Sequence, residues 1–192
     1  MFKKMFTRFS KVVAAGLVLS FMFLVPGAEA SHWGLSGGLQ THDPTIVRES
    51  GNTWWSASTG TGIGMKYSTN GGKTWTDGLP IFSRPLSWWK KYAPNMTTND
   101  VWAPDLEYYR GRYYCYYSVS EFGKNNSAIG LVSCSSISKG DWRDDGVVLY
   151  SRYGSSKFNA IDPNLVVDAK GKPWLVYGSW FDGIHVVRLN QS

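Results

Sequence analysis

The sequence predicts an all-β protein whose strands recur in units of about 60 residues. After residue 30 no stretch has the apolar periodicity of an amphipathic helix of three turns. Instead, short runs rich in Val, Ile, Tyr, Trp and Thr alternate with Gly, Asn, Asp and Ser, which is typical of strands joined by turns. The expected strands are 44–48, 53–58, 62–68, 106–109, 112–119, 127–134, 147–149, 164–168, 173–179 and 183–189.

The first thirty residues have the pattern of a secretory signal peptide. Basic residues lie between Lys3 and Lys11, an apolar run follows at 12–25, and Ala28-Glu29-Ala30 is a small-residue cleavage pattern. A membrane anchor is the alternative, but about 14 apolar residues fall short of the roughly 20 that a spanning helix needs. We expect a signal at 1–30 and a secreted, extracellular mature chain at 31–192 without a membrane span.

The charge of the mature chain excludes a strongly basic binding surface. Four of the 20 basic residues and one of the 14 acidic residues lie in the signal, so the mature net charge is +3. No nucleic-acid partner is expected at that charge. Cys115 and Cys134 lie on neighbouring expected strands, where one disulfide and two buried thiols are equally compatible with the sequence. A monomer is expected, although no sequence feature specifies the oligomeric state.

Three stretches share one pattern and define the repeat. They are "HDPTIVRESGNTWWSAST" from His42, "WAPDLEYYRGRYYCYYSVS" from Trp102 and "NAIDPNLVVDAKGKPWLVYGSW" from Asn159. Aligning Asp43, Asp105 and Asp162 gives spacings of 62 and 57 residues. A repeat of this length that holds a four-stranded meander indicates one blade of a β-propeller. The expected blade repeats are 43–104, 105–161 and 162–192.

The position of the three acids predicts a common pocket. In a propeller the first strand of each blade is innermost, so residues at the head of that strand converge on the central channel. Inverting glycoside hydrolysis uses one carboxylate as base and one carboxylic acid, and a further carboxylate can raise the pKa of the acid. The alternative interpretation is that each Asp-Pro pair only stabilises a turn. The motif "STNGGKTW" (Ser68 to Trp75) is a degenerate Asp-box hairpin and supports the fold alone.

The ordered motifs "THDPTIV", "VWAPDLEYYRGRYYCYYSVSEFGKNNSAIGL" and "NAIDPNLVVDAKGKPWLVYGSWFDGI" resemble the arabinanases of glycoside hydrolase family 43. The resemblance runs from about Trp33 to Leu189. It implies a five-bladed β-propeller and a secreted, inverting endo-1,5-α-L-arabinanase that acts on arabinan and arabino-oligosaccharides.

The resemblance also implies roles for individual residues. Asp43 matches the general base, and Asp162 matches the aspartate that orients the general acid and raises its pKa. Asp105 is expected to be a hydrogen-bonding residue of the pocket wall. The remaining expected substrate contacts are Trp102, Phe122, Gly123, Asn159, Ala160, Ile161, Ser179, Trp180 and Phe181. In "GSWF" the two aromatic residues are swapped relative to the order usual in the family.

The resemblance places the general acid beyond residue 192. Glu49, Glu107 and Glu121 are the glutamates after the signal, and none stands in the context of the family's acid. The sequence is therefore interpreted as an N-terminal fragment with roughly three of five blades, the third incomplete. The calcium that the family holds in its central channel is expected to need a histidine beyond residue 192, so no metal ligands are assigned here.

Two alternatives to an arabinanase remain. A related propeller xylosidase or arabinofuranosidase would cleave aryl glycosides in preference to linear arabinan. A non-catalytic arabinan-binding propeller would bind the polysaccharide unchanged.

Overall fold

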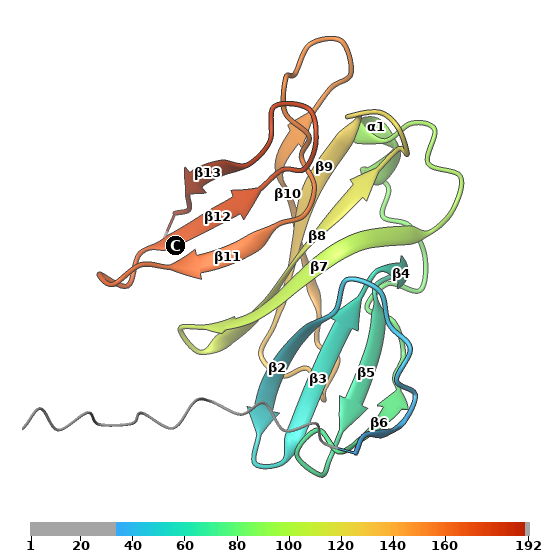
Figure 1. Ribbon diagram of the computed structural model, residues 1–192, viewed down its shortest axis with the longest axis vertical. Coiled ribbons are helices and arrows are strands. Elements are labelled where there is room, and N and C mark those ends of the chain that lie inside the picture. The colour runs from blue at the N-terminus through green and yellow to red at the C-terminus, as the bar shows by residue number, and fades with distance from the viewer. Residues whose placement is uncertain (1–33, 191–192) are drawn as a thin grey trace, which may run out of the picture. The chain divides into compact units, whose positions relative to one another are not determined.

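The computed structural model describes residues 34–190, which belong to one compact unit (Figure 1). The described chain forms three sheets, and the centre of each is an antiparallel meander of strands close in sequence; sheets one and two each carry one further two-residue strand at an edge. The one helix of the described chain, α1 (Trp89–Tyr92), has four residues, and no described helix is long and apolar enough to cross a membrane. The all-β prediction is confirmed, whereas the predicted signal peptide lies outside the described residues.

Sheet one contains β2 (Thr45–Ser50), β3 (Thr53–Ser58), β5 (Gly64–Ser68) and β6 (Thr74–Asp77) in antiparallel order. The short strand β1 (Ser36–Gly37) pairs in parallel with β6 at the outer edge. The strand expected at 62–68 begins two residues later, at Gly64, because Gly62 and Ile63 both have positive φ. This turn separates β5 from β4 (Gly60–Thr61), which pairs with sheet two.

Sheet two is the longest and lies between the other two (Figure 1). Its strands are β7 (Asp100–Tyr109), β8 (Arg112–Ser120), β9 (Ser127–Cys134) and β10 (Arg143–Ser151). β7 begins six residues before the expected strand. Sheet three contains β11 (Asn164–Val167), β12 (Pro173–Tyr177) and β13 (His185–Arg188).

The hydrophobic core consists of two clusters, one on each face of sheet two. Because side chains alternate across a strand, Cys115 and Tyr117 face sheet one while Tyr116 faces sheet three. The first cluster contains Trp89, packed edge-on against Phe82 and hydrogen-bonded through its indole to the Tyr117 hydroxyl. Each sheet is therefore held chiefly by burial against its neighbour in sequence.

Cys115 and Cys134 are both buried free thiols. They face the first cluster from β8 and β9. Burial raises the pKa of Cys134 to about 12, so its thiol is protonated and packs as a small apolar group. The structure thus resolves the alternative left open by the sequence.

Each sheet has a similar backbone corner near the start of β2, β7 or β11, and these corners are not aligned on the three acids. The equivalent residues are Asp43, Ala103 and Asp162, each directly before a proline and each with a positive φ of 49°, 36° and 54° respectively. Their spacings are 60 and 59 residues. We call these residues the corner residues. Asp105 is two positions past the corner of sheet two, and a register irregularity separates it from Trp102.

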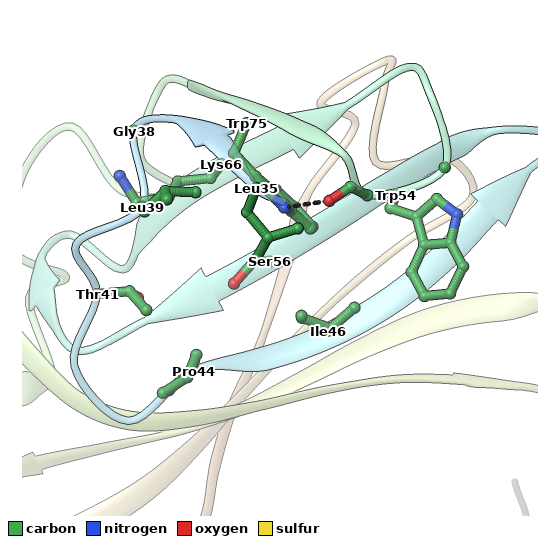
Figure 2. Close-up of a pocket in the computed structure, with 12 residues that line it drawn as sticks. Leu35, Gly38, Leu39, Thr41, Pro44, Ile46, Trp54, Ser56, Lys66 and Trp75 are labelled. Atoms are coloured by element: carbon green, nitrogen blue, oxygen red, sulfur yellow. Dashed lines mark hydrogen bonds between the residues drawn. The ribbon is translucent and has the colours of Figure 1, made fainter. Parts of the chain in front are cut away.

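The face of sheet one turned away from sheet two carries an apolar cavity of about 320 Å³ (Figure 2). Segment 35–44 covers it with Leu35 and Leu39, above Ile46 and Trp54. The Trp75 indole donates to the Gly72 carbonyl at 2.8 Å, the interaction dashed in Figure 2. That bond belongs to the Ser68–Trp75 hairpin, whose Asn70 Oδ1 also accepts the Thr74 amide at 2.9 Å. The predicted structural role of this hairpin is therefore confirmed.

Glu49, near the end of β2, joins sheet one to sheet two. Its carboxylate accepts hydrogen bonds from the Trp55 indole at 2.8 Å, from the Ser136 hydroxyl at 2.7 Å, and from the amide and hydroxyl of Ser138. Burial alone raises the pKa of Glu49, but the hydrogen bonds from Ser138, Ser136 and Trp55 outweigh it and lower the pKa overall. The charged carboxylate thus stabilises the contact between the two sheets.

We expect Glu49→Gln to lower the free energy of unfolding at neutral pH by about 1–2 kcal/mol, because an amide cannot accept all four donors. Since the pKa of Glu49 is lowered on folding, its stabilisation is present above the ordinary value near 4.5 and is lost as the pH falls through the folded value. Urea denaturation of both proteins between pH 3 and pH 8 measures this difference.

The matched control is Glu107→Gln on β7. Burial, followed by the charge of Asp105, raises the pKa of Glu107, so removing this charge should not destabilise the protein at neutral pH. Equal losses of stability for both variants would contradict the role assigned to Glu49.

Candidate active site

A cavity of about 560 Å³ opens where the heads of the three sheets meet. Sheet one contributes Asp43, sheet two contributes Trp102 and the loop after β8, and sheet three contributes Asp162 and the loop after β12. Ten of the twelve predicted site residues line it: Asp43, Trp102, Phe122, Gly123, Asn159, Ile161, Asp162, Ser179, Trp180 and Phe181. The outer cavity of sheet one has no acidic lining residue, so this cavity is the candidate for chemistry.

Asp43 presents its carboxylate from the corner of sheet one. The side chain is 43% exposed, and its Oδ2 accepts the Thr59 hydroxyl at 2.6 Å. The same oxygen lies 3.1 Å from Nδ1 of His42. The corner therefore holds one carboxylate oxygen by two neighbours while the group remains accessible from the cavity.

Asp162 occupies the equivalent corner of sheet three, and its amide donates to the Ser118 hydroxyl at 3.1 Å. Its side chain touches solvent, but the surrounding protein removes part of its hydration. This desolvation, together with the negative charge of Asp43, raises the pKa of Asp162, while the Ser179 hydroxyl opposes the increase. The two corner carboxylates are therefore electrostatically coupled.

Glu121 also lines the cavity but is held as a carboxylate. It accepts the Asn95 amide at 2.8 Å and side-chain amides of Asn95 and Asn126 at 3.2 Å each. Burial raises its pKa, but these bonds and the nearby Lys124 lower it overall. A general acid needs the opposite shift. Glu107, whose pKa is raised, does not line the cavity.

Exposed aromatic rings surround the opening. Phe122 is 95% exposed, Trp180 is 85% exposed and Phe181 is 52% exposed. Trp180 and Phe181 are consecutive residues with φ of 56° and 50°, a strained turn closed by the Gly183 amide donating to the Trp180 carbonyl. Flat rings of this kind fit the apolar faces of sugar rings.

Segment 156–162 is anchored to sheet two by a buried polar network. The Asn159 Oδ1 accepts the Ser127 hydroxyl at 2.7 Å, and the Asn125 side chain donates to two carbonyls of the segment. The Ala160 amide donates to Ser151, and Ala160 itself is fully buried in the second core cluster. The prediction that Ala160 contacts substrate is therefore corrected: it holds the segment in place.

Asp105 is the second correction. It is 6% exposed and does not line the cavity. Its Oδ2 accepts the Leu165 amide at 2.6 Å and its Oδ1 accepts the Asn164 side chain at 3.3 Å, so it joins sheet two to β11. It does form hydrogen bonds, as expected, but to sheet three rather than across the pocket, because it lies two residues past the corner.

Sequence reasoning missed Glu121 and Lys124 as lining residues, as well as the hydroxyls of Thr59 and Ser118 behind the corners. Lys124 directly follows Gly123 in the second motif that resembles the arabinanases. The two hydroxyl residues lie 16 and 15 positions after Asp43 and Ala103. When the sequence is aligned on the proline that follows each corner residue, Thr59 and Ser118 fall at nearly the same distance from it, and this is the signal that could have identified them.

Residues 34–190 hold no group of three or more His, Cys, Asp or Glu side chains arranged to bind a metal ion. His42 and Asp43 alone do not make a calcium site. The described residues alone therefore do not provide a complete calcium site.

Two carboxylates in one cavity, with aromatic rings at its rim, are the features of a glycoside hydrolase site. Comparison with known proteins agrees. The family model of glycosyl hydrolases family 43 matches residues 38–192. The extracellular endo-α-(1→5)-L-arabinanase 1 of Bacillus subtilis (strain 168) is 46% identical over 198 aligned residues, which cover 99% of this chain and 59% of that protein.

Solved structures show the same likeness. The GH43 endo-arabinanase from Bacillus licheniformis superposes with a TM-score of 0.79 at 50% identity, covering 84% of this chain and 55% of that one. The Cellvibrio cellulosa α-L-arabinanase complexed with arabinohexaose gives a TM-score of 0.74 at 35% identity, covering 79% and 48%. The chain belongs to glycosyl hydrolases family 43, and it spans between about half and three fifths of these relatives.

We expect Asp162→Asn to raise the unfolding midpoint at pH 7. Because the pKa of Asp162 is raised on folding, the wild-type protein loses stability as the pH rises through the folded value, and the variant does not. The difference should vanish below the ordinary aspartate value near 3.8. Asparagine tolerates the positive φ of this corner. Thermal melts of both proteins from pH 3 to pH 8 measure the effect.

Asp168→Asn, in the β11–β12 hairpin, is the control with the opposite sign. The Lys172 amide and the Trp174 indole lower the pKa of Asp168, so its loss should reduce stability at pH 7. An Asp162→Asn protein that melts below wild type at pH 7 would contradict the electrostatic coupling.

Proposed function

We propose that the protein is an extracellular glycoside hydrolase that cleaves internal α-1,5-arabinofuranosyl linkages of arabinan with inversion. The observation that carries this proposal is the convergence of Asp43 and Asp162 on one cavity rimmed by exposed aromatic rings. The names of the B. subtilis and B. licheniformis relatives support arabinan as the substrate.

In the proposed mechanism Asp43 is the general base. A water molecule between Asp43 and the anomeric carbon gives its proton to the carboxylate while its oxygen attacks the carbon. The glycosidic bond breaks on the opposite face, and a general acid protonates the departing oxygen. One displacement inverts the configuration at the anomeric carbon.

Asp162 is proposed to act on the general acid. A negative charge close to a carboxylic acid raises its pKa and keeps it protonated near neutrality. Within residues 34–190, the remaining acidic group of the cavity is Glu121, whose pKa is lowered. The proposed enzyme therefore takes its general acid from outside the described residues.

The three sheets are proposed to be blades of a five-bladed β-propeller. Their meander order and the contacts of β7 with both β2 and β11 support this arrangement. The outer faces of sheets one and three expose Ile46, Val166 and Val186, which suits burial against further blades. A calcium ion in the central channel of the full-length protein is also proposed, held partly by a histidine beyond residue 192. The protein is proposed to act as a monomer, without nucleic-acid or membrane partners.

Asp43→Asn in the full-length protein should lower kcat on linear arabinan by about 10²–10⁴-fold, because general-base assistance is lost. Asparagine keeps the size of the side chain, so binding of arabinohexaose should change little. Release of reducing ends gives the rate, and isothermal titration gives the binding.

Asp77→Asn, an exposed substitution on β6 outside the cavity, is the matched control and should leave turnover unchanged. Near-normal hydrolysis by Asp43→Asn would rule out its role as base. A wild-type protein that binds arabinohexaose without cleaving it would point to a sugar-binding module. Preferential cleavage of aryl xylosides or arabinofuranosides would point to a related exo-acting glycosidase.

A further inference from the structure

Thr59, directly after β3, lies between the corners of sheets one and two. Its amide donates to the His42 carbonyl at 2.9 Å. Its hydroxyl contacts two groups: the Ala103 amide lies 2.8 Å from Oγ1, and Oγ1 lies 2.6 Å from Oδ2 of Asp43. One side chain thus connects both corners.

The direction of these hydrogen bonds follows from the chemistry of the groups. A backbone amide only donates, so the Thr59 oxygen accepts from Ala103. A hydroxyl has a single proton, and a carboxylate only accepts. The Thr59 proton therefore points to Oδ2 of Asp43, and the backbone of sheet two sets its orientation.

The two oxygens of Asp43 differ as a result. Oδ2 is occupied by the Thr59 hydroxyl and faces Nδ1 of His42 at 3.1 Å. No described residue donates to Oδ1. The carboxylate is thus held by one oxygen, and the other is available to a water molecule in the cavity.

Ser118 in sheet two is the equivalent of Thr59, and comparing the two residues separates the hold on the Asp43 carboxylate from a purely structural role. Ser118 accepts the Asp162 amide at 3.1 Å, as Thr59 accepts the Ala103 amide. The corner residue of Ser118's own sheet is Ala103, which has no carboxylate to hold. The hydroxyls of Thr59 and Ser118 therefore both accept an amide of the following sheet, and the Thr59 hydroxyl in addition donates to the Asp43 carboxylate.

We propose that Thr59 is a positioning residue for the reaction: it holds Oδ2 of Asp43 so that Oδ1 meets the attacking water. This inference rests on the proposed function of Asp43 as general base. Thr59 does not line the cavity, so its loss should affect turnover and not substrate binding.

The test compares three variants of the full-length protein on linear arabinan. Thr59→Val keeps the shape and removes the hydroxyl, and we expect kcat to fall by up to about 10²-fold, the size of effect seen when a reacting group is misplaced. KM should change by less than about twofold, since no substrate contact is lost. Thr59→Ser restores the hydroxyl and should recover most of kcat.

Thr45→Val is the matched control. The Thr45 hydroxyl accepts the Leu106 amide at 3.2 Å, so this substitution also removes an acceptor between sheets one and two, but it does not touch Asp43. It should keep kcat near wild type. If Thr59→Val retains wild-type kcat, or if Thr45→Val and Thr59→Val lose activity equally, the inference is overturned while the proposed function stands.

A double-mutant cycle on stability tests the contact without an activity assay. Thr59→Val and Asp43→Ala should shift the unfolding midpoint non-additively, whereas Thr45→Val and Asp43→Ala should add. Additive shifts for the first pair would overturn the inference whether or not arabinan is cleaved. Absence of hydrolysis by the wild-type protein would instead remove the proposed function and, with it, the catalytic meaning of the contact.

Discussion

The structure depends on satisfying the backbone amides along the inner edge of each sheet. Apart from the two-residue pairing of β7 with β4, the first strand of sheet two and of sheet three has a partner strand on one side only. The remaining amides of that strand lie against the preceding sheet, where an unpaired buried amide is costly. Side chains of the preceding sheet accept them. The donor and acceptor pairs are Ala103 with Thr59, Leu106 with Thr45, Asp162 with Ser118, and Leu165 with Asp105.

This constraint explains how the site is formed. Because the same amides are bonded at each junction, the corner residues recur in register and direct their side chains to one end of the sheets. Two of the corners carry carboxylates, which meet in the cavity. Desolvation there, followed by the negative charge of Asp43, raises the pKa of Asp162. Thr59 accepts the backbone amide of the Ala103 corner and donates its hydroxyl proton to the carboxylate of the Asp43 corner. Packing and chemistry therefore share the same hydrogen bonds.

The all-β class could be predicted from the sequence, as could the gathering of ten of the residues that line the corner cavity, because alternating strands, turn residues and Asp-Pro pairs are local signals. Sequence reasoning failed where tertiary contacts decide. Asp105 looked equivalent to Asp43 and Asp162 by residue type, but the proline sets the register, and the true equivalent is Ala103. The depressed pKa of Glu121 depends on amides from Asn95 and Asn126, whose approach no local pattern in the sequence indicates.

If Asp43 and Asp162 define the place where arabinan is cleaved, a crystal structure of full-length Asp43→Asn with arabinohexaose should show the sugar chain across the exposed rings of Phe122 and Trp180. One glycosidic bond should then lie beside residues 43 and 162. An oligosaccharide bound elsewhere, such as over Trp54 and Trp75 in the outer cavity of sheet one, with the corner cavity empty, would show that these carboxylates do not mark the cleavage site.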